Sequence, residues 1–307
     1  MKIAIIGGTG AMGSAFGAAL TQGGNDVTLV DVVQEAVDLI NERGVTIRDG
    51  AGAENAVQIK ATTDPGSIGK ADLVLVFVKC YHTEAAIAAA KPMFGPDTVV
   101  LSLQNGWGNA QRISDIAGAE RVLVGVTYHS AALLGPGHVL HAGRGATFIG
   151  ELNGAISDRL ETVADVFQKS ELDVTASPRI VDEIWKKLAL NVCTLPTSSL
   201  LRLTAGELPQ HEGVVSLMRV LLDETKAVAK AKGIELDQEE RWNTINAVLA
   251  RAGAAKSSML QDVEKQRRTE IDVINGAIVA AGREAGVPTP HNDTMVWLIK
   301  SLEETFA

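Results

Sequence analysis

The first 31 residues constrain the fold of this chain more than any other stretch. Ile3 to Ile6 form a short apolar run that ends at Gly7 and Gly8, which predicts a buried strand. The glycines at positions 8, 10 and 13 follow the pattern GxGxxG, and the small residues from Ala11 to Leu20 predict a helix. In this pattern the first glycine permits a tight turn, the second lets a diphosphate approach the backbone, and the third lets the helix pack close to the strand. The unit is therefore predicted to hold the diphosphate of a dinucleotide at the helix N-terminus.

Asp31 adds a second signal to the glycine motif. It follows a predicted strand from Asp26 to Val30 and lies 18 residues after Gly13, close to the distance at which dinucleotide-binding folds place an acid. A carboxylate there accepts hydrogen bonds from the ribose hydroxyls and repels a 2′-phosphate, so NADH is favoured over NADPH. A glycine-rich turn that only packs against its neighbours would not need this acid. The cofactor-binding residues predicted in this stretch are Gly8, Thr9, Gly10, Ala11, Met12, Gly13 and Asp31.

The composition disfavours several classes of function. The 307 residues suggest two domains, and 46% hydrophobic with 21% charged residues is typical of a soluble globular protein. A net charge of −9 gives no electrostatic reason to bind nucleic acid or an anionic membrane. The sequence shows no signal-peptide pattern and no apolar run of about 20 residues, so we expect a cytoplasmic protein. Cys80 and Cys193 lie far apart in apolar surroundings and the histidines lack metal-ligand spacing, so no metal is expected.

Strand and helix patterns alternate after Asp31, which predicts an α/β fold with a doubly wound, mainly parallel sheet. The predicted elements are a helix from Gln34 to Arg43, a small hairpin around Asp49 to Gly52, a strand from Val57 to Ala61, a strand from Leu73 to Val78, a helix from Thr83 to Ala90, and strands from Thr98 to Leu103 and from Val122 to Tyr128. Lys79 and Asn105 come just after two of these strands. Since ligands gather at the carboxyl ends of parallel strands, both residues are expected near a cofactor or substrate.

Residues 135–145, GPGHVLHAGRG, alternate apolar and polar positions between glycines and predict an antiparallel hairpin added to the sheet. His138 and His141 would lie on opposite faces of a strand, which argues against a shared metal. A strand from Ala146 to Leu152, a helix from Ile156 to Ser170 and a strand from Leu172 to Ala176 complete a first domain over residues 1–178.

From residue 179 onward, apolar residues recur every three or four positions, which predicts an all-helical second domain over residues 179–307. Breaks are expected near Pro196, Gly206 to Pro209, Gly233 and Gly253. The clearest predicted helices run from Val214 to Lys232 and from Thr269 to Ala285.

Candidate catalytic residues lie in this helical part. Lys187 and Asn191 are four residues apart and share a helix face. Burial favours the neutral form of a lysine and makes it a better proton donor, although a lysine stem can also cover apolar surface while its ammonium stays in water. Ser258 and Gln261 fit a capping box, in which Ser258 only starts a helix, and Glu270 fits a solvated surface acid equally well. The residues alone leave these alternatives open.

Motifs in one order run along nearly the whole chain. They are the glycine motif at 8–13, Lys79, Gln104-Asn105-Gly106, Trp185-x-Lys187-Leu188-x-x-Asn191, Ser257 to Asp262 and Thr269 to Asp272. Together they resemble the ketopantoate reductase family, also called 2-dehydropantoate 2-reductases. The resemblance implies a Rossmann domain joined to a helical domain, with an active site in the cleft between them. It also implies reduction of a 2-oxo acid with a nicotinamide cofactor, as in pantothenate and coenzyme A biosynthesis.

The resemblance also implies roles for single residues. Lys187 would protonate the carbonyl oxygen of the substrate, and Glu270 would be its partner. An ammonium at this place stabilises the negative charge that grows on the oxygen as hydride reaches the keto carbon. The residues implied to surround the substrate are Asn105, Asn191 and Ser258, and those added to the cofactor site are Lys79 and Asn105.

Three positions depart from the family pattern. Leu195 and Ala255 stand where the family commonly has asparagines, so two polar groups that could hold the hydroxylated end of ketopantoate are missing. A dehydrogenase for bulkier, more apolar 2-oxo acids, forming the D-2-hydroxy acid, is therefore the alternative. Asp31 is followed by two valines, whereas many members have a basic residue there and use NADPH. Lys79 matches a position that can contact a 2′-phosphate, and NADH is predicted on the strength of Asp31.

Other classes of function stay as alternatives. A catalytically silent sensor of the NAD redox state would not need both Lys187 and Glu270. Reduction of an imine or oxidation of a phosphorylated alcohol has no motif of its own here. The predicted partner is a small-molecule 2-oxo acid, and the apolar surface of the helical part allows a homodimer.

Overall fold

The computed structural model of the protein describes residues 1–306. Its residues form two compact units. Unit 1 comprises Met1–Gln104 and Asn109–Ile180, and unit 2 comprises Asn105–Gly108 and the residues from Val181 onward. The predicted domain limits, 1–178 and 179–307, stay a prediction. The short segment Asn105–Gly108 interrupts unit 1 in the sequence but groups with unit 2.

Unit 1 is built on an eight-stranded sheet in the order β12-β11-β8-β7-β6-β1-β2-β5. The strands are β1 (Lys2–Ile6), β2 (Asp26–Val30), β5 (Lys60–Thr62), β6 (Ala71–Val76), β7 (Phe94–Ser102), β8 (Val122–Thr127), β11 (Thr147–Gly150) and β12 (Val174–Ala176). From β5 to β8 all neighbours are parallel, and only β11 meets β8 in the antiparallel sense. Ile3 and Ile5 of the central strand are fully buried. This architecture confirms the predicted fold class.

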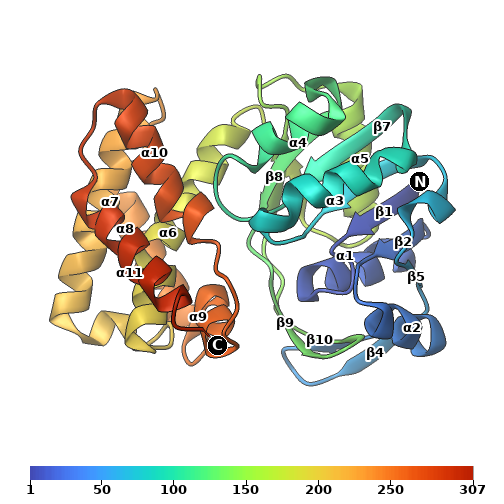
Figure 1. The fold of residues 1–307 in the computed structure, drawn as a ribbon, viewed down its shortest axis with the longest axis horizontal. Coiled ribbons are helices and arrows are strands. Elements are labelled where there is room, and N and C mark those ends of the chain that lie inside the picture. The colour runs from blue at the N-terminus through green and yellow to red at the C-terminus, as the bar shows by residue number, and fades with distance from the viewer. Residues whose placement is uncertain (307) are drawn as a thin grey trace. The chain divides into compact units, whose positions relative to one another are not determined.

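Helices cover the sheet, as Figure 1 shows for this unit. They are α1 (Ala11–Gln22), α2 (Gln34–Arg43), α3 (Thr83–Ala90), α4 (Asn109–Ala117) and α5 (Asp158–Lys169). α1 contacts β1 and β2 of the large sheet and also β9 and β10 of a second sheet, so it lies between the two. Its small residues allow this double packing, and its Phe16 is fully buried.

The second sheet has four strands in the order β4-β3-β10-β9. They are β3 (Val45–Asp49), β4 (Glu54–Val57), β9 (Ser130–Gly135) and β10 (His138–Gly143). β3 and β4 form the small hairpin predicted around Asp49 to Gly52. The antiparallel hairpin predicted within residues 135–145 is wrong in its limits, because only β10 lies wholly in that stretch and its antiparallel partner β9 precedes it. The expectation that the hairpin extends the main sheet is also wrong. β10 pairs in parallel with β3 instead.

The strand predicted from Val57 to Ala61 is also wrong, because one short run supplies strands to two sheets. Val57 ends β4 and pairs with Val45 in the second sheet. Ala61 belongs to β5 and pairs with Leu29 in the large sheet. The two histidines of β10 have different surroundings: His138 lies 2.9 Å from a carboxylate oxygen of Glu54, whereas His141 is buried.

Unit 2 is helical, as predicted. Its helices are α6 (Ile180–Leu201, which begins at the last residue of unit 1), α7 (Glu212–Ala231), α8 (Gln238–Ala252), α9 (Ser258–Glu264), α10 (Asn275–Ala285) and α11 (Pro290–Glu303). Short 3-10 helices occur at Pro65–Ile68, Cys80–His82, Lys91–Met93, Ala119–Arg121, Leu208–Gln210 and Ile271–Val273. The predicted helix from Thr269 to Ala285 is wrong over its first turns. Ile274 has φ −105° and ψ −95°, outside the helical region, so α10 begins only at Asn275.

The break predicted near Pro196 is absent, since α6 runs through this proline. A proline cannot donate a hydrogen bond to the carbonyl four residues earlier, which here belongs to Val192. The Asn275 side chain fills this role, because its Nδ2 donates to the Val192 carbonyl oxygen at 3.2 Å. Asn275 is fully buried, and it also donates to Oδ1 of Asn292 at 3.0 Å. A side chain from α10 thus allows α6 to continue.

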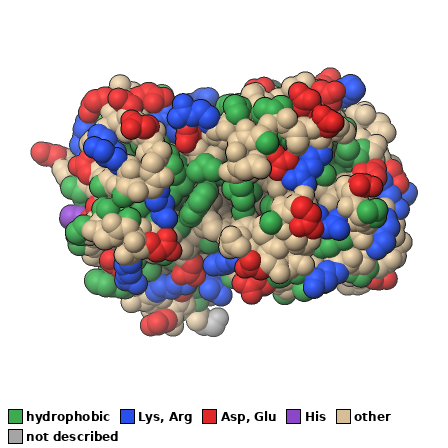
Figure 2. Space-filling model, turned by 90° about the horizontal axis from the view of Figure 1, so that it is seen from above, with side chains coloured by type: hydrophobic (Ala, Val, Ile, Leu, Met, Phe, Trp, Pro, Cys, Tyr) green, Lys and Arg blue, Asp and Glu red, His purple; other side chains and the backbone are tan. Residues whose placement is uncertain are grey.

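The surface carries mixed charges. On the face that Figure 2 draws, acidic and basic side chains alternate over the described residues, and no broad basic patch gathers there. Among residues 1–306, no helix is both long and apolar enough to cross a membrane.

Candidate functional site

The glycine loop follows β1 and opens α1. The backbone N–H groups of Gly7 and Gly8 both donate to the Val30 carbonyl, at 2.9 and 3.0 Å, which ties the loop to the end of β2. A Cβ at Gly13 would lie 2.4 Å from the Gly7 carbonyl oxygen, so only glycine lets the helix approach the loop. Gly10 is the N-cap residue of α1, and no described side chain caps this helix start. The first N–H groups of the helix are therefore suited to an anionic ligand.

Asp31 lies beside this loop. Its Oδ2 accepts a hydrogen bond from the Thr9 backbone N–H at 3.1 Å, and its Oδ1 accepts one from the Val32 N–H at 2.8 Å. The carboxylate is therefore fixed at the rim of the glycine loop, although the two stretches are separated along the chain. The Val32 side chain that follows is 92% exposed. An acid held here can accept hydrogen bonds from a ribose bound beside the diphosphate.

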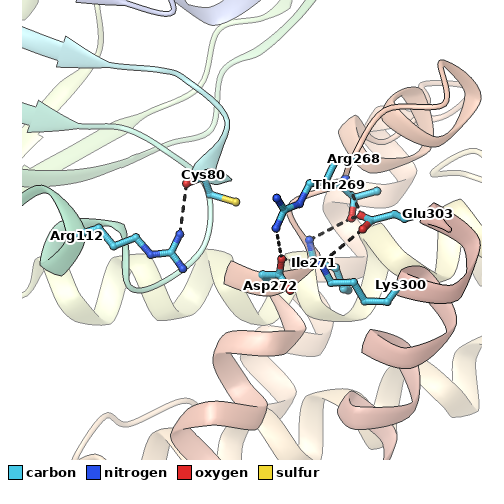
Figure 3. Close-up of polar contacts among 8 residues, drawn as sticks. All are labelled: Cys80, Arg112, Arg268, Thr269, Ile271, Asp272, Lys300 and Glu303. Atoms are coloured by element: carbon cyan, nitrogen blue, oxygen red, sulfur yellow. Dashed lines mark hydrogen bonds and ion pairs between the residues drawn. The ribbon is translucent and has the colours of Figure 1, made fainter. Parts of the chain in front are cut away.

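The carboxyl ends of β6 and β7 are joined by Gln104. Its Nε2 donates to the Val78 carbonyl and to Oγ1 of Thr83, at 2.8 Å each. Lys79 lies in the loop between these two partners and is partly buried. Arg112 of α4 donates to the Cys80 carbonyl at 3.3 Å, which holds the turn after Lys79, as Figure 3 shows. The motif Gln104-Asn105-Gly106 includes Gln104, but the sequence alone did not predict that its side chain joins these two strand ends.

Three of the predicted site residues come together in unit 2. The Lys187 ammonium donates to Oδ1 of Asn105 at 2.9 Å, and Nδ2 of Asn105 donates to Oε2 of Glu270 at 3.4 Å. The amide of Asn105 therefore bridges the ammonium of Lys187 on α6 and the carboxylate of Glu270 in the loop before α10. Only 6% of the surface of Glu270 is exposed to solvent. The alternative in which Glu270 is a solvated surface acid is therefore wrong.

The electrostatics of this group suit proton transfer. Burial lowers the pKa of Lys187 from 10.5 to about 8, and the Glu270 carboxylate acts in the opposite direction by raising it. A lysine with this pKa carries a proton at neutral pH and can also give it up. The arrangement can therefore donate a proton to an oxygen that gains negative charge, or accept it in the reverse reaction.

The segment around Glu270 is held by α11, as Figure 3 shows. Oε1 of Glu303 accepts hydrogen bonds from the N–H and the hydroxyl of Thr269, at 2.7 and 2.6 Å. Oδ2 of Asp272 accepts from Lys300 at 2.7 Å and from Arg268 at 3.1 Å. Desolvation raises the pKa of Asp272, but the hydrogen bonds from Lys300 and Arg268 outweigh it and lower the pKa below its usual value.

The other predicted substrate residues are placed differently. Asn191 is buried on α6, one turn beyond Lys187, and Leu195 follows one turn later with 9% exposure. Ser258 is exposed at the first position of α9. The alternative in which Ser258 only caps the helix is wrong, because Oγ of Ser257 accepts the hydrogen bond from the Leu260 N–H at 3.1 Å. Among residues 1–306, neither Asn191 nor Ser258 is hydrogen-bonded to the group around Lys187.

The fold and these features define a class of protein, the dinucleotide-dependent oxidoreductases that combine a Rossmann sheet with a helical unit. Two family models match the chain: "Ketopantoate reductase PanE/ApbA" over residues 3–154 and "Ketopantoate reductase PanE/ApbA C terminal" over residues 179–303. The chain belongs to the ketopantoate reductase family, which confirms the resemblance seen in its motifs.

Individual relatives cover nearly the full length. A 2-dehydropantoate 2-reductase of Streptococcus pyogenes is 32% identical over 97% of each chain, and one of Pyrococcus horikoshii is 34% identical over 99% of this chain and 98% of its own. A structure of D-mandelate dehydrogenase with NADH and anilino(oxo)acetate superposes with a TM-score of 0.94 at 30% identity, and 99% of each chain is covered. A PanE/ApbA family ketopantoate reductase from Ralstonia eutropha superposes with a TM-score of 0.90 at 32% identity, again over 99% of each chain.

Proposed function

We propose that this protein reduces a 2-oxo acid to the D-2-hydroxy acid with a reduced nicotinamide dinucleotide, and that ketopantoate is the first candidate substrate. The observation that carries the proposal is the Asn105 amide, which bridges Lys187 and Glu270 and presents an ammonium whose pKa is about 8. The relatives named 2-dehydropantoate 2-reductase support this substrate class.

The residues of the glycine loop fit a dinucleotide. The uncapped start of α1 and the glycines at 8, 10 and 13 leave room for a diphosphate against backbone N–H groups. Asp31 would bind the ribose, and Lys79 would add a positive charge at the end of β6. When bound, the dihydronicotinamide supplies the hydride. We propose that NADH is preferred, because the Asp31 carboxylate repels a 2′-phosphate.

The cofactor preference can be measured directly. We expect kcat/KM to be higher with NADH than with NADPH, and the Asp31→Ser variant to lower this ratio by at least tenfold. Asp38→Ser, on the exposed face of α2, is the matched control and should leave the ratio unchanged. A wild-type preference for NADPH would contradict the role given to Asp31.

Lys187 is the proposed acid. Its ammonium would donate a hydrogen bond to the carbonyl oxygen of the 2-oxo acid and pass its proton to this oxygen as negative charge develops there. Glu270 and Asn105 would keep the ammonium oriented, and Glu270 offsets part of the cost of burying it. Asn191 and Ser258 would bind the carboxylate or other polar groups of the substrate.

A second candidate substrate class is favoured by Leu195. This buried leucine lies two turns beyond Lys187 on α6, and Ala255 provides no polar side chain in the loop before α9. A branched or aromatic 2-oxo acid fits such a site better than a hydroxylated one. The similarity to D-mandelate dehydrogenase, whose structure contains anilino(oxo)acetate, supports this second class.

Turnover of ketopantoate, 2-oxoisovalerate and phenylglyoxylate, each with NADH, decides between the two classes. If the apolar class is correct, Leu195→Asn should raise kcat/KM for ketopantoate relative to the other two by roughly 10-fold, the effect of one added hydrogen bond of about 1.4 kcal/mol. Unchanged ratios would show that Leu195 does not contact the substrate.

Replacing Lys187 with alanine tests the reaction itself. We expect turnover to fall by at least about 100-fold, while binding of NADH, followed by its fluorescence, stays within twofold of wild type. A non-catalytic sensor of the NAD redox state would instead bind NADH and show no turnover of any 2-oxo acid, even in the wild-type protein.

We also propose that the protein forms a homodimer through its helical unit. Trp297, Leu298 and Leu201 are large apolar side chains with exposures of 62%, 49% and 49%. Light scattering measures the molar mass, and a monomer at all concentrations would contradict the proposal.

A further inference from the structure

The segment Asn105–Gly108 is held to the rest of unit 2 by its backbone. The Trp107 N–H donates to the Val273 carbonyl oxygen at 2.8 Å. Gly106 has a φ of +86°, and a Cβ at this position would lie 2.2 Å from the same carbonyl oxygen. Only glycine permits this close approach, so the backbone on the C-terminal side of Asn105 is fixed against the loop that follows Glu270.

The Trp107 side chain makes a second contact, with α6 of the same unit. Its ring centroid lies 5.8 Å from that of Trp185, with an angle of 57° between the ring planes. Trp185 is fully buried, and its Nε1 has no hydrogen-bond partner among residues 1–306. Packing rather than hydrogen bonding therefore orients this indole, and Trp107 is part of that packing. Trp185 lies two residues before Lys187 on α6.

We propose that Trp107 is a positioning residue, which holds the Asn105 amide between Lys187 and Glu270 and so determines how the proton donor is presented. The inference rests on the proposed function. Trp107 connects the two sides of the group: its backbone is bound to the residue three positions after Glu270, and its indole is packed on the helix that carries Lys187. A hydrogen bond of 2.9 Å is lost when one partner moves by about 1 Å, so small displacements of this segment are sufficient to disturb the group.

Two substitutions of Trp107 test whether the packing of its ring on Trp185 positions the group around Lys187. In Trp107→Ala the ring is lost, and we expect kcat for 2-oxo acid reduction to fall by roughly 10- to 100-fold, the cost of such a misplacement. Water entering beside Lys187 should raise its pKa, so the loss of rate at alkaline pH should move to higher pH. Trp107→Phe keeps a ring on Trp185, and its kcat should stay within about fivefold of wild type. Ile156→Ala, which truncates an exposed apolar side chain outside the group around Lys187, is the control and should leave kcat and the pH profile unchanged.

A glycine pair tests the backbone contact independently. Gly106 and Gly108 both have positive φ, +86° and +100°, but a Cβ at Gly108 meets no atom within 4 Å. Both alanine variants carry the backbone strain, whereas only Gly106→Ala displaces the segment from Val273. We expect Gly106→Ala to reduce kcat at least tenfold more than Gly108→Ala does.

The circular dichroism spectrum reports whether the indole pair exists in solution. Wild type should show the exciton couplet of paired indoles, which Trp107→Phe should remove. The proposal is overturned if Trp107→Ala keeps the wild-type kcat and pH profile while Lys187→Ala is inactive, or if the two glycine variants have equal rates. An active Lys187→Ala would instead overturn the proposed function. If Trp107→Ala does not fold, the glycine pair still decides the matter.

Discussion

The pKa of Lys187 predicts how the rate depends on pH. Reduction needs the ammonium form, so kcat/KM should be constant at low pH, fall to half its maximum near pH 8 and decrease further above it. With a pKa of about 8, roughly 90% of the protein carries the ammonium at pH 7 and roughly 10% at pH 9, so the rate should fall about tenfold between them. A lysine with the ordinary pKa of 10.5 would still be about 97% protonated at pH 9 and would show almost no change.

The reverse reaction should have the opposite profile. Oxidation of the 2-hydroxy acid needs the neutral amine as base, so its kcat/KM should rise through a midpoint near pH 8 and level off at higher pH. Values of kcat/KM for the 2-oxo acid and for the 2-hydroxy acid, measured at each pH, provide the two profiles. Mirror-image curves with a common midpoint identify one group that acts as acid and as base.

Two variants connect the midpoint to particular residues. The Glu270 carboxylate raises the pKa of Lys187, so Glu270→Gln should move the midpoint of both profiles to lower pH. Lys186→Ala is the matched control, because the neighbouring Lys186 is paired with Glu183 at 2.7 Å and lies outside the group. A reduction rate that stays flat between pH 7 and pH 9, or a midpoint that does not move in Glu270→Gln, would refute the reasoning.

Two further predictions concern stability and the serine pair. Asn275→Ala leaves the Val192 carbonyl without its buried donor and should cost about 1–3 kcal/mol of unfolding free energy, measured by urea denaturation. In a Pro196→Ala background a helical N–H again becomes available to that carbonyl, so the cost should be smaller, and equal costs in both backgrounds would refute the coupling. Ser257→Ala removes the cap of α9 and should lower the unfolding free energy by about 1 kcal/mol. Ser258→Ala should leave stability unchanged and raise KM for the 2-oxo acid, and the reverse pattern would exchange the roles of the two serines.

The sequence by itself determined the parts of the protein that depend on neighbouring residues. β2, α2 and α3 have the predicted limits, because apolar periodicity and flanking glycines act over a few residues. The glycine motif and Asp31 were readable for the same reason, since a strand, a tight turn and a helix follow one another directly. Lys187 and Glu270 were singled out by a resemblance to a family, whereas their own spacing left solvated alternatives open.

Only the tertiary structure decided which distant residues meet. The amide of Asn105 joins side chains that are 82 and 165 positions away, and no local pattern encodes such pairs. Asn275 likewise supplies the hydrogen bond that allows α6 to pass through Pro196, a partner 83 residues from the carbonyl it serves. Local propensity predicted a break near Pro196 because proline lacks a backbone N–H donor. The buried side-chain amide of Asn275 provides the missing hydrogen bond. Long-range packing therefore determines which residues meet to form the proton-donating group.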